Sequence, residues 1–279
     1  MALNLPTFYK RLGSSIVFVA VMLMGLLWNE WAFLVLVCLI QVLCLREYFR
    51  LVQNIDKETY WPKWLPIVIQ VTGLTILVPI LYLGHLLDSS FIAWPLIIWG
   101  IIPAVPAVLL LASVLSKKNS FIAMLQSIGG LFYITLPVLL LLDMRLQNFI
   151  LPLALILMIW SNDTMAYLVG SFIGKTPFSS ISPKKTWEGT IGGVVLTITG
   201  AALCGYFTHT FRMADWIMLA LCATVAGTLG DMLESKLKRI ADVKDSGNLM
   251  PGHGGALDRF DSLLIATPFA FLYVHYFMR

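Results

Sequence analysis

The sequence predicts an all-α protein, a polytopic membrane helix bundle with about nine transmembrane helices. The 279 residues are 59% hydrophobic and 12% charged, whereas soluble domains are about 45–50% apolar and about 25% charged. The apolar residues form uninterrupted runs of spanning length without the alternation of a membrane β-barrel, so their backbone groups must be paired within helices. Together these observations exclude an ordinary soluble domain.

Nine apolar runs define the expected spans. They are residues 14–28, 31–45, 65–84, 91–115, 121–142, 149–170, 190–208, 214–231 and 262–278. We expect one membrane domain, 1–279, with N-terminal transmembrane helices in 1–148 and a catalytic half in 149–279. The two long loops of that half, 171–189 and 232–261, are rich in charge, glycine and proline. Polar loops held by a rigid scaffold commonly carry function, so the chemistry is expected there.

The distribution of Lys and Arg predicts the orientation. Most of these residues lie in the amino-terminal tail and in alternate loops, whereas Arg145, Arg212 and Arg279 lie on the opposite side. Excess positive charge marks the cytoplasmic side, so the amino terminus and both long loops are expected there. The net charge of +4 therefore reflects orientation. Since no basic, aromatic-interleaved arm is present, nucleic acid is not an expected partner.

Asp163 lies inside the expected span 149–170, towards its cytoplasmic end. A carboxylate at the centre of a membrane helix costs about 2.5–3.5 kcal/mol, so Asp163 should face a cavity or a cation. A polar contact between helices is the alternative reading of this residue.

A second group of polar residues follows the expected span 214–231. Asp231, Glu234, Ser235 and Lys238 are separated by helical spacings, which places acid, hydroxyl and base on one stripe. If the helix continues beyond the membrane surface, the stripe offers ligands for metal and phosphate. A solvated amphipathic turn is the alternative.

The start of the last helix carries two further acids, Asp258 and Asp261, on one face. Hard cations such as Mg²⁺ bind oxygen ligands, often one or two carboxylates together with substrate phosphates. Acids at this position would also interact favourably with the helix dipole. That alternative does not account for the neighbouring Gly254 and Gly255, which allow backbone N–H groups to approach a phosphate. His253 either positions the phosphate or the loop, or acts as an acid/base group.

These residues resemble the phosphatidate cytidylyltransferase family, also called CDP-diacylglycerol synthases. The C-terminal pattern of that family is matched by Ser235, Lys238-Arg239, Lys244-Asp245, His253-Gly254-Gly255 and Asp258-Arg259-Phe260-Asp261. Its upstream element is matched by the segment Ser182 to Gly189, preceded by Asp163 and Tyr167 and followed by Gly230-Asp231. Met250 and Ala256 depart from the larger aliphatic residues usual there. The N-terminal half resembles the family only in being apolar.

The resemblance implies a nucleotidyltransferase of phospholipid biosynthesis, in which CTP and phosphatidate give CDP-diacylglycerol and pyrophosphate. It also implies an integral protein of the bacterial cytoplasmic (inner) membrane, with its active site facing the cytoplasm. The partners would be CTP, phosphatidate and membrane lipids, and a homodimer is one candidate assembly. The cofactor would be Mg²⁺, as one ion or with a second cation.

On this resemblance, the site residues fall into three sets. The metal ligands would be Asp231, Asp258 and Asp261, with Asp163 as a further candidate. The catalytic set would add Lys238, Arg239 and His253. The substrate-binding set would comprise Ser182, Lys184, Lys185, Ser235, Lys244, Asp245, Gly254 and Gly255, in which the cations neutralise phosphate.

Two other functions stay open at this stage. A CTP-dependent lipid kinase would use similar charged loops. An ion-coupled transporter would account for Asp163 within a span and for glycine-broken helices. A transporter predicts acids spread across the depth of the membrane, however, whereas Asp231, Asp258 and Asp261 are expected at one surface.

Overall fold

The structure is a computed structural model that describes residues 5–86, 104–114, 120–179, 181–249 and 254–278. In these residues the regular secondary structure is helical, apart from isolated β-bridge residues, among them the pair Pro177 and Thr186. The prediction of an all-α protein is therefore confirmed.

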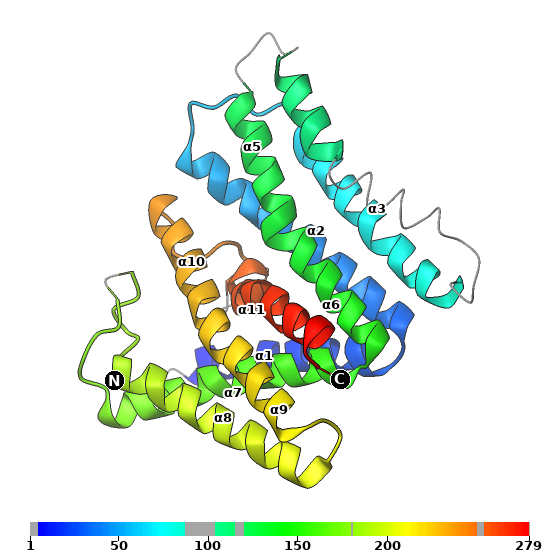
Figure 1. Ribbon diagram of the computed structural model, residues 1–279. Helices are drawn as coiled ribbons and strands as arrows, with labels where there is room; N and C mark the ends of the chain where they lie inside the picture. The colour runs from blue at the N-terminus through cyan, green and yellow to red at the C-terminus, as the bar shows by residue number, and fades with distance from the viewer. Residues whose placement is uncertain (1–4, 87–103, 115–119, 180, 250–253, 279) are drawn as a thin grey trace.

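Ten labelled α-helices form the framework (Figure 1). They are α1 (Leu5–Leu27), α2 (Glu30–Ile55), α3 (Leu65–Leu86), α5 (Phe121–Gly130), α6 (Leu136–Gln147), α7 (Ile150–Ile173), α8 (Trp187–Thr208), α9 (Met213–Leu221), α10 (Gly227–Ile240) and α11 (Leu257–Tyr276). A further apolar helix covers Ala104–Val114. The side chain of the N-cap residue itself caps α2 and α8: Asn29 accepts from the N–H of Ala32 at 2.7 Å, and Thr186 accepts from that of Gly189 at 3.2 Å.

Two of the long helices contain a π-helical turn. The segment η1 (Leu131–Thr135) joins α5 to α6, and η2 (Cys222–Ala226) joins α9 to α10. The first lies just before Pro137 in α6. Because proline has no N–H and its ring crowds the carbonyl four residues earlier, a wider turn relieves the backbone at this point.

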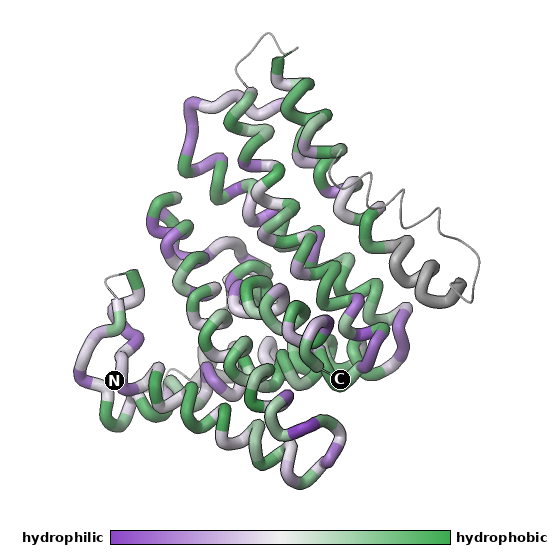
Figure 2. Tube along the Cα trace, in the orientation of Figure 1, coloured by the Kyte–Doolittle hydropathy of each residue, from purple (hydrophilic) through white to green (hydrophobic). Residues whose placement is uncertain are grey.

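Five of the described helices are long and apolar enough to cross a membrane, namely Glu30–Ile55, Phe121–Gln147, Ile150–Ile173, Trp187–Thr208 and Met213–Ile240. Shorter apolar stretches cover Gly13–Leu27, Leu65–Leu77 and Ala104–Val114. Figure 2 shows hydrophobic residues along most helices, with hydrophilic residues at the end of α10 and in connecting loops. The total of about nine spans and the cytoplasmic amino terminus stay predictions, and much of the expected span 91–115 lies outside the described residues.

Several boundaries differ from those expected. Helix α2 continues past residue 45 to Ile55, and the helix that begins at Met213 continues past Asp231 to Ile240. The long loops are therefore shorter than predicted, at 174–186 and 241–256. The physical reason is that charged residues with high helix propensity continue each helix, and that some of them, including Glu47 and Glu234, are buried against other helices.

Helices α10 and α11 lie against each other and run in opposite directions, with α2 and α7 also in contact with α11. Figure 1 shows α2, α3 and the continuous α5–α6 helix on one side of this pair, and α7 with α8 on the other. Apolar side chains such as Val37, Leu142, Leu155 and Leu264 fill the core between them. The arrangement brings the end of α10, the start of α11 and the end of α2 together.

Candidate active site

An ion-pair network joins the end of α10 to the start of α11. Lys238 forms ion pairs with Glu234, one turn earlier on α10, and with Asp258, whose Oδ1 lies 2.5 Å from Nζ. Glu234 is fully buried, and the Lys238 side chain is only 13% exposed. Because a buried charge is costly without a partner, Lys238 fixes the relative position of the two helices.

The carboxylate of Asp258 also holds the loop that precedes α11. Its Oδ2 accepts from the backbone N–H of Ser246 at 2.9 Å, from the Ser246 hydroxyl at 3.0 Å and from the N–H of Gly255 at 2.7 Å. Burial by itself would raise the pKa of Asp258, but the bonds from Lys238 and Gly255 hold that pKa below its ordinary value. Asp258 is therefore ionised and already supplied with several donors.

Asp231 and Asp261 form a second group beside this network. The two carboxyl groups lie within hydrogen-bonding range of each other, and Asp261 is only 7% exposed. Asp231 also forms an ion pair with Lys185. Two adjacent carboxylates repel each other unless a proton or a cation lies between them. We call the residues Glu47, Asp231, Glu234, Asp258 and Asp261, with Lys185 and Lys238, the acid cluster.

The loop between α7 and α8 is folded back so that Lys185 reaches α10. Its ends are joined by the bonds Phe178 N–H to Lys185 O, 2.8 Å, and Trp187 N–H to Thr176 O, 3.0 Å. On α7, Asp163 lies close enough to Lys185, Asp231 and Arg259 to interact electrostatically with each of them. The structure thus brings the predicted residues Asp163 and Lys185 to Asp231, although they are distant in the sequence.

The remaining predicted residues lie on the same helices and loops as the cluster, or outside the described residues. Lys184, Arg239, Lys244 and Asp245 are exposed, and Ser182 and Ser235 are half-buried. His253 lies outside the described residues. Gly254 has a φ of 82°, in the left-handed region that favours glycine. The N–H of Gly255, predicted to approach a phosphate, donates to Asp258 in this structure.

The predicted metal ligands are divided between two groups of carboxylates. In the part of the chain that the structure describes, no three or more His, Cys, Asp or Glu side chains are placed to hold one ion. The carboxylate of Asp258 is engaged by Lys238, Ser246 and Gly255, whereas Asp231 and Asp261 face each other. This pair fits a hard divalent cation, because the cation would relieve their repulsion and take its other oxygen ligands from phosphate and water. The metal assignment stays a prediction.

Glu47 is the site residue that the sequence interpretation missed. It lies on α2, was expected in a loop after the span 31–45, and contacts Ser246 and the first backbone N–H groups of α11. Helical periodicity would have found it. Val37, Ile40 and Cys44 form the buried stripe of α2, and continuing that stripe at helical spacing reaches Glu47.

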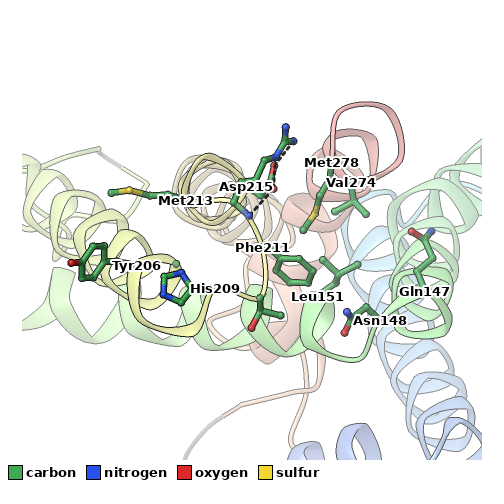
Figure 3. A pocket seen from close by; sticks show the side chains of 13 residues that line it. Gln147, Asn148, Leu151, Tyr206, His209, Phe211, Met213, Asp215, Val274 and Met278 are labelled. Carbon is green, nitrogen blue, oxygen red and sulfur yellow. Dashed lines mark hydrogen bonds and ion pairs between the residues drawn. The ribbon is translucent and has the colours of Figure 1, made fainter.

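A cavity of about 730 Å³ lies at the opposite end of α11 (Figure 3). Figure 3 shows His209, Phe211 and Asp215 along one side of it and Gln147 and Asn148 along another. The acidic residue here is already partnered, because Asp215 accepts from Arg212 and from Tyr273. The cavity contains none of the predicted site residues, so we place the candidate active site at the acid cluster.

Comparison with known proteins identifies the family to which the chain belongs. Residues 9–277 match the sequence model of the cytidylyltransferase family. A phosphatidate cytidylyltransferase of Bacillus subtilis is 46% identical over 115 residues, which are 40% of this chain and 43% of that protein. The proteins of the same name from Haemophilus influenzae and Staphylococcus aureus are 39% and 38% identical. Those alignments cover 46% and 59% of this chain, and 46% and 65% of the relatives. The aligned parts thus span about half the length of these relatives.

Proposed function

The chain belongs to the cytidylyltransferase family, and from this membership we propose that it is a membrane phosphatidate cytidylyltransferase of phospholipid biosynthesis. Its substrates would be CTP and phosphatidate, and its products CDP-diacylglycerol and pyrophosphate. The observation that carries the proposal is the family match over residues 9–277. The acid cluster supports it, because it combines a carboxylate pair with a lysine from a separate loop.

In the proposed reaction, an oxygen of the phosphatidate phosphate attacks the α-phosphorus of CTP, and the bond to the β-phosphate oxygen breaks to release pyrophosphate. Such transfers depend mainly on positioning and on neutralisation of charge. Asp231 and Asp261 would hold Mg²⁺, which supplies charge neutralisation at the phosphates when bound. Lys184, Arg239 and Lys244 are exposed and would attract triphosphate and lipid phosphate. Lys185 would bring one cation to the carboxylate pair.

Labelled CTP separates this activity from a lipid kinase. Purified protein in detergent and lipid, with Mg²⁺ and phosphatidate, should transfer the label of [α-³²P]CTP into lipid and release labelled pyrophosphate from [γ-³²P]CTP. A CTP-dependent lipid kinase given diacylglycerol would instead transfer the γ label into lipid. Absence of α label in lipid, across several detergents and lipids, would refute the proposal. Neither the family match nor the named relatives favour a kinase or a transporter.

We also propose that the protein is integral to the bacterial cytoplasmic membrane and that the acid cluster faces the cytoplasm. Lys185 of the loop 174–186 reaches Asp231 on α10, the helix that leads into the loop 241–256. The first loop carries Lys175, Lys184 and Lys185, and Lys236, Lys238, Arg239 and Lys244 lie at the end of α10 and in the second loop. In a variant without the four native cysteines, Ser179→Cys and Thr210→Cys should react with an impermeant thiol reagent from opposite faces. Labelling of both from one face would contradict this topology. The predicted homodimer is tested by crosslinking in membranes.

A further inference from the structure

Glu47 is an acid from the N-terminal half of the chain that lies against Ser246 and the start of α11. Its side chain is on α2, and the residue is 6% exposed. The rest of the buried α2 face is mostly apolar, for example Cys44, Tyr48 and Leu51. An acid buried in such a position needs donors to offset its lost hydration. All three donors described for it come from the segment around the start of α11.

The first contact is a cap on α11. Oε1 of Glu47 accepts from the N–H of Ala256 at 3.0 Å, and Oε2 accepts from that of Leu257 at 2.8 Å. The residue at the N-cap position, Ala256, has no side chain that can serve this purpose. A carboxylate at this end satisfies N–H groups that lack helical partners and interacts favourably with the helix dipole. A residue more than two hundred positions earlier thus caps the helix that carries Asp258 and Asp261.

The second contact links Glu47 to Asp258 through one hydroxyl group. The Oγ of Ser246 lies 2.9 Å from Oε2 of Glu47 and 3.0 Å from Oδ2 of Asp258. A serine hydroxyl has one hydrogen, so it donates to one of the two carboxylates at a time. Ser246 therefore ties the position of Asp258 to that of Glu47.

The backbone around Glu47 leaves no room for other side chains. A Cβ atom at Gly247 would lie 2.2 Å from Oε1 of Glu47, and one at Gly255 would lie 2.3 Å from Oε2. Side-chain atoms do not approach this closely, so glycine at both positions allows the loop to close around the carboxylate. In this structure, glycine at position 255 therefore makes room for the carboxylate of Glu47.

We infer that Glu47 is a positioning residue, which fixes Ser246, Gly247 and the start of α11 so that Asp258 and Asp261 are held in their working geometry. The expected effect of Glu47 on turnover rests on the proposed function. Glu47 acts through Ser246 and the backbone of Ala256 and Leu257. It also makes α2 part of the active site.

The substitution Glu47→Gln tests this role in the full-length protein. The amide is similar in size but lacks the charge, and its NH₂ group would face a backbone donor. We expect kcat per folded protein to fall about 30-fold while the KM for CTP changes less than about threefold. Glu47→Asp, which keeps the charge on a shorter side chain, should recover part of kcat. Asp215→Asn is the matched control, because it alters a buried, hydrogen-bonded acid far from the site and should leave kcat within about twofold.

Hydrogen exchange provides a readout that does not depend on the reaction. Amides in the peptide 254–260 should exchange at least about tenfold faster in Glu47→Gln, whereas peptides of α7 should not change. If wild-type protein forms no CDP-lipid, the proposed function fails, and exchange still decides whether Glu47 holds this segment. If Glu47→Gln does not fold, Ser246→Ala takes its place, with an expected fall in kcat of at least about fivefold. A folded Glu47→Gln or Ser246→Ala variant with normal kcat and normal exchange would overturn the inference.

Discussion

The two ends of the helix pair formed by α9–α10 and α11 each contain a buried acid network, and they differ in charge balance. At one end, Asp215 is 1% exposed. Its carboxylate accepts from Nε and Nη2 of Arg212 at 3.1 and 3.0 Å and from the Tyr273 hydroxyl at 2.7 Å. One acid therefore meets one cation and a phenol. Such a closed network joins α9 to α11 and has no need of a ligand.

At the other end, the acid cluster has more carboxylates than paired lysines. Lys238 forms ion pairs with both Glu234 and Asp258, and Lys185 forms one with Asp231. Asp261 lies beside Asp231. Neighbouring carboxyl groups in a partly buried position are costly unless protons, cations or a ligand compensate for their charge. The comparison shows that a buried acid can be fully partnered within the protein, whereas the proposed site lies at the end where neighbouring acids outnumber their paired lysines.

The largest effect should come from removing the shared cation of the acid cluster. Lys238→Met keeps the apolar part of the side chain but removes the cation that is paired with Glu234 and Asp258. Breaking a buried ion pair on one side costs about 3–5 kcal/mol, so we expect a large fall in melting temperature together with loss of turnover. Thermal unfolding in detergent measures the first quantity. An unchanged melting temperature would show that Lys238 does not link α10 to α11.

A somewhat smaller effect is expected when the carboxylate pair is altered. Asp261→Asn removes one charge beside Asp231 without a change in size. Turnover should fall at least about 100-fold, or roughly 2.7 kcal/mol of transition-state stabilisation, while stability is kept because a buried acid is replaced by a neutral side chain of the same size. Turnover per folded protein is measured across a Mg²⁺ titration. Normal turnover at every Mg²⁺ concentration would refute the metal assignment.

The smallest effect on activity is expected at the balanced end. Asp215→Asn weakens the bonds from Arg212 and Tyr273, and hydrogen bonds to charged groups contribute about 1.5–3 kcal/mol each. The melting temperature should therefore fall, although turnover of the folded fraction should stay within about twofold. Thermal unfolding and turnover of the folded fraction are measured in parallel for Asp215→Asn and the wild-type protein. A specific loss of turnover would mean that the two ends are not functionally distinct.

The sequence was informative where helical spacing alone determines the face on which a residue lies. The stripe of Asp231, Glu234 and Lys238 is on one helix, as predicted, and so are Asp258 and Asp261. Long-range partners could not be predicted in the same way. Spacing along one helix does not reveal that Lys238 pairs with Asp258, or that Glu47 caps α11, because these contacts depend on how separate helices pack. The shared face of Asp258 and Asp261 likewise did not predict that only Asp261 lies beside Asp231.

The π-helical turn η2 gives the helix Met213–Ile240 a change of angular register between its two ends. An α-helix advances about 100° per residue, and a π turn adds a residue without adding a full α-helical step. Asp215 before the turn and Lys238 after it both face α11, where they contact Tyr273 and Asp258. If the same residues were wound as a regular α-helix throughout, the second half of the helix would be rotated by about 100° relative to the first. The π turn thus offsets the angular register of the two halves, so that the polar residues of both halves face the same neighbouring helix.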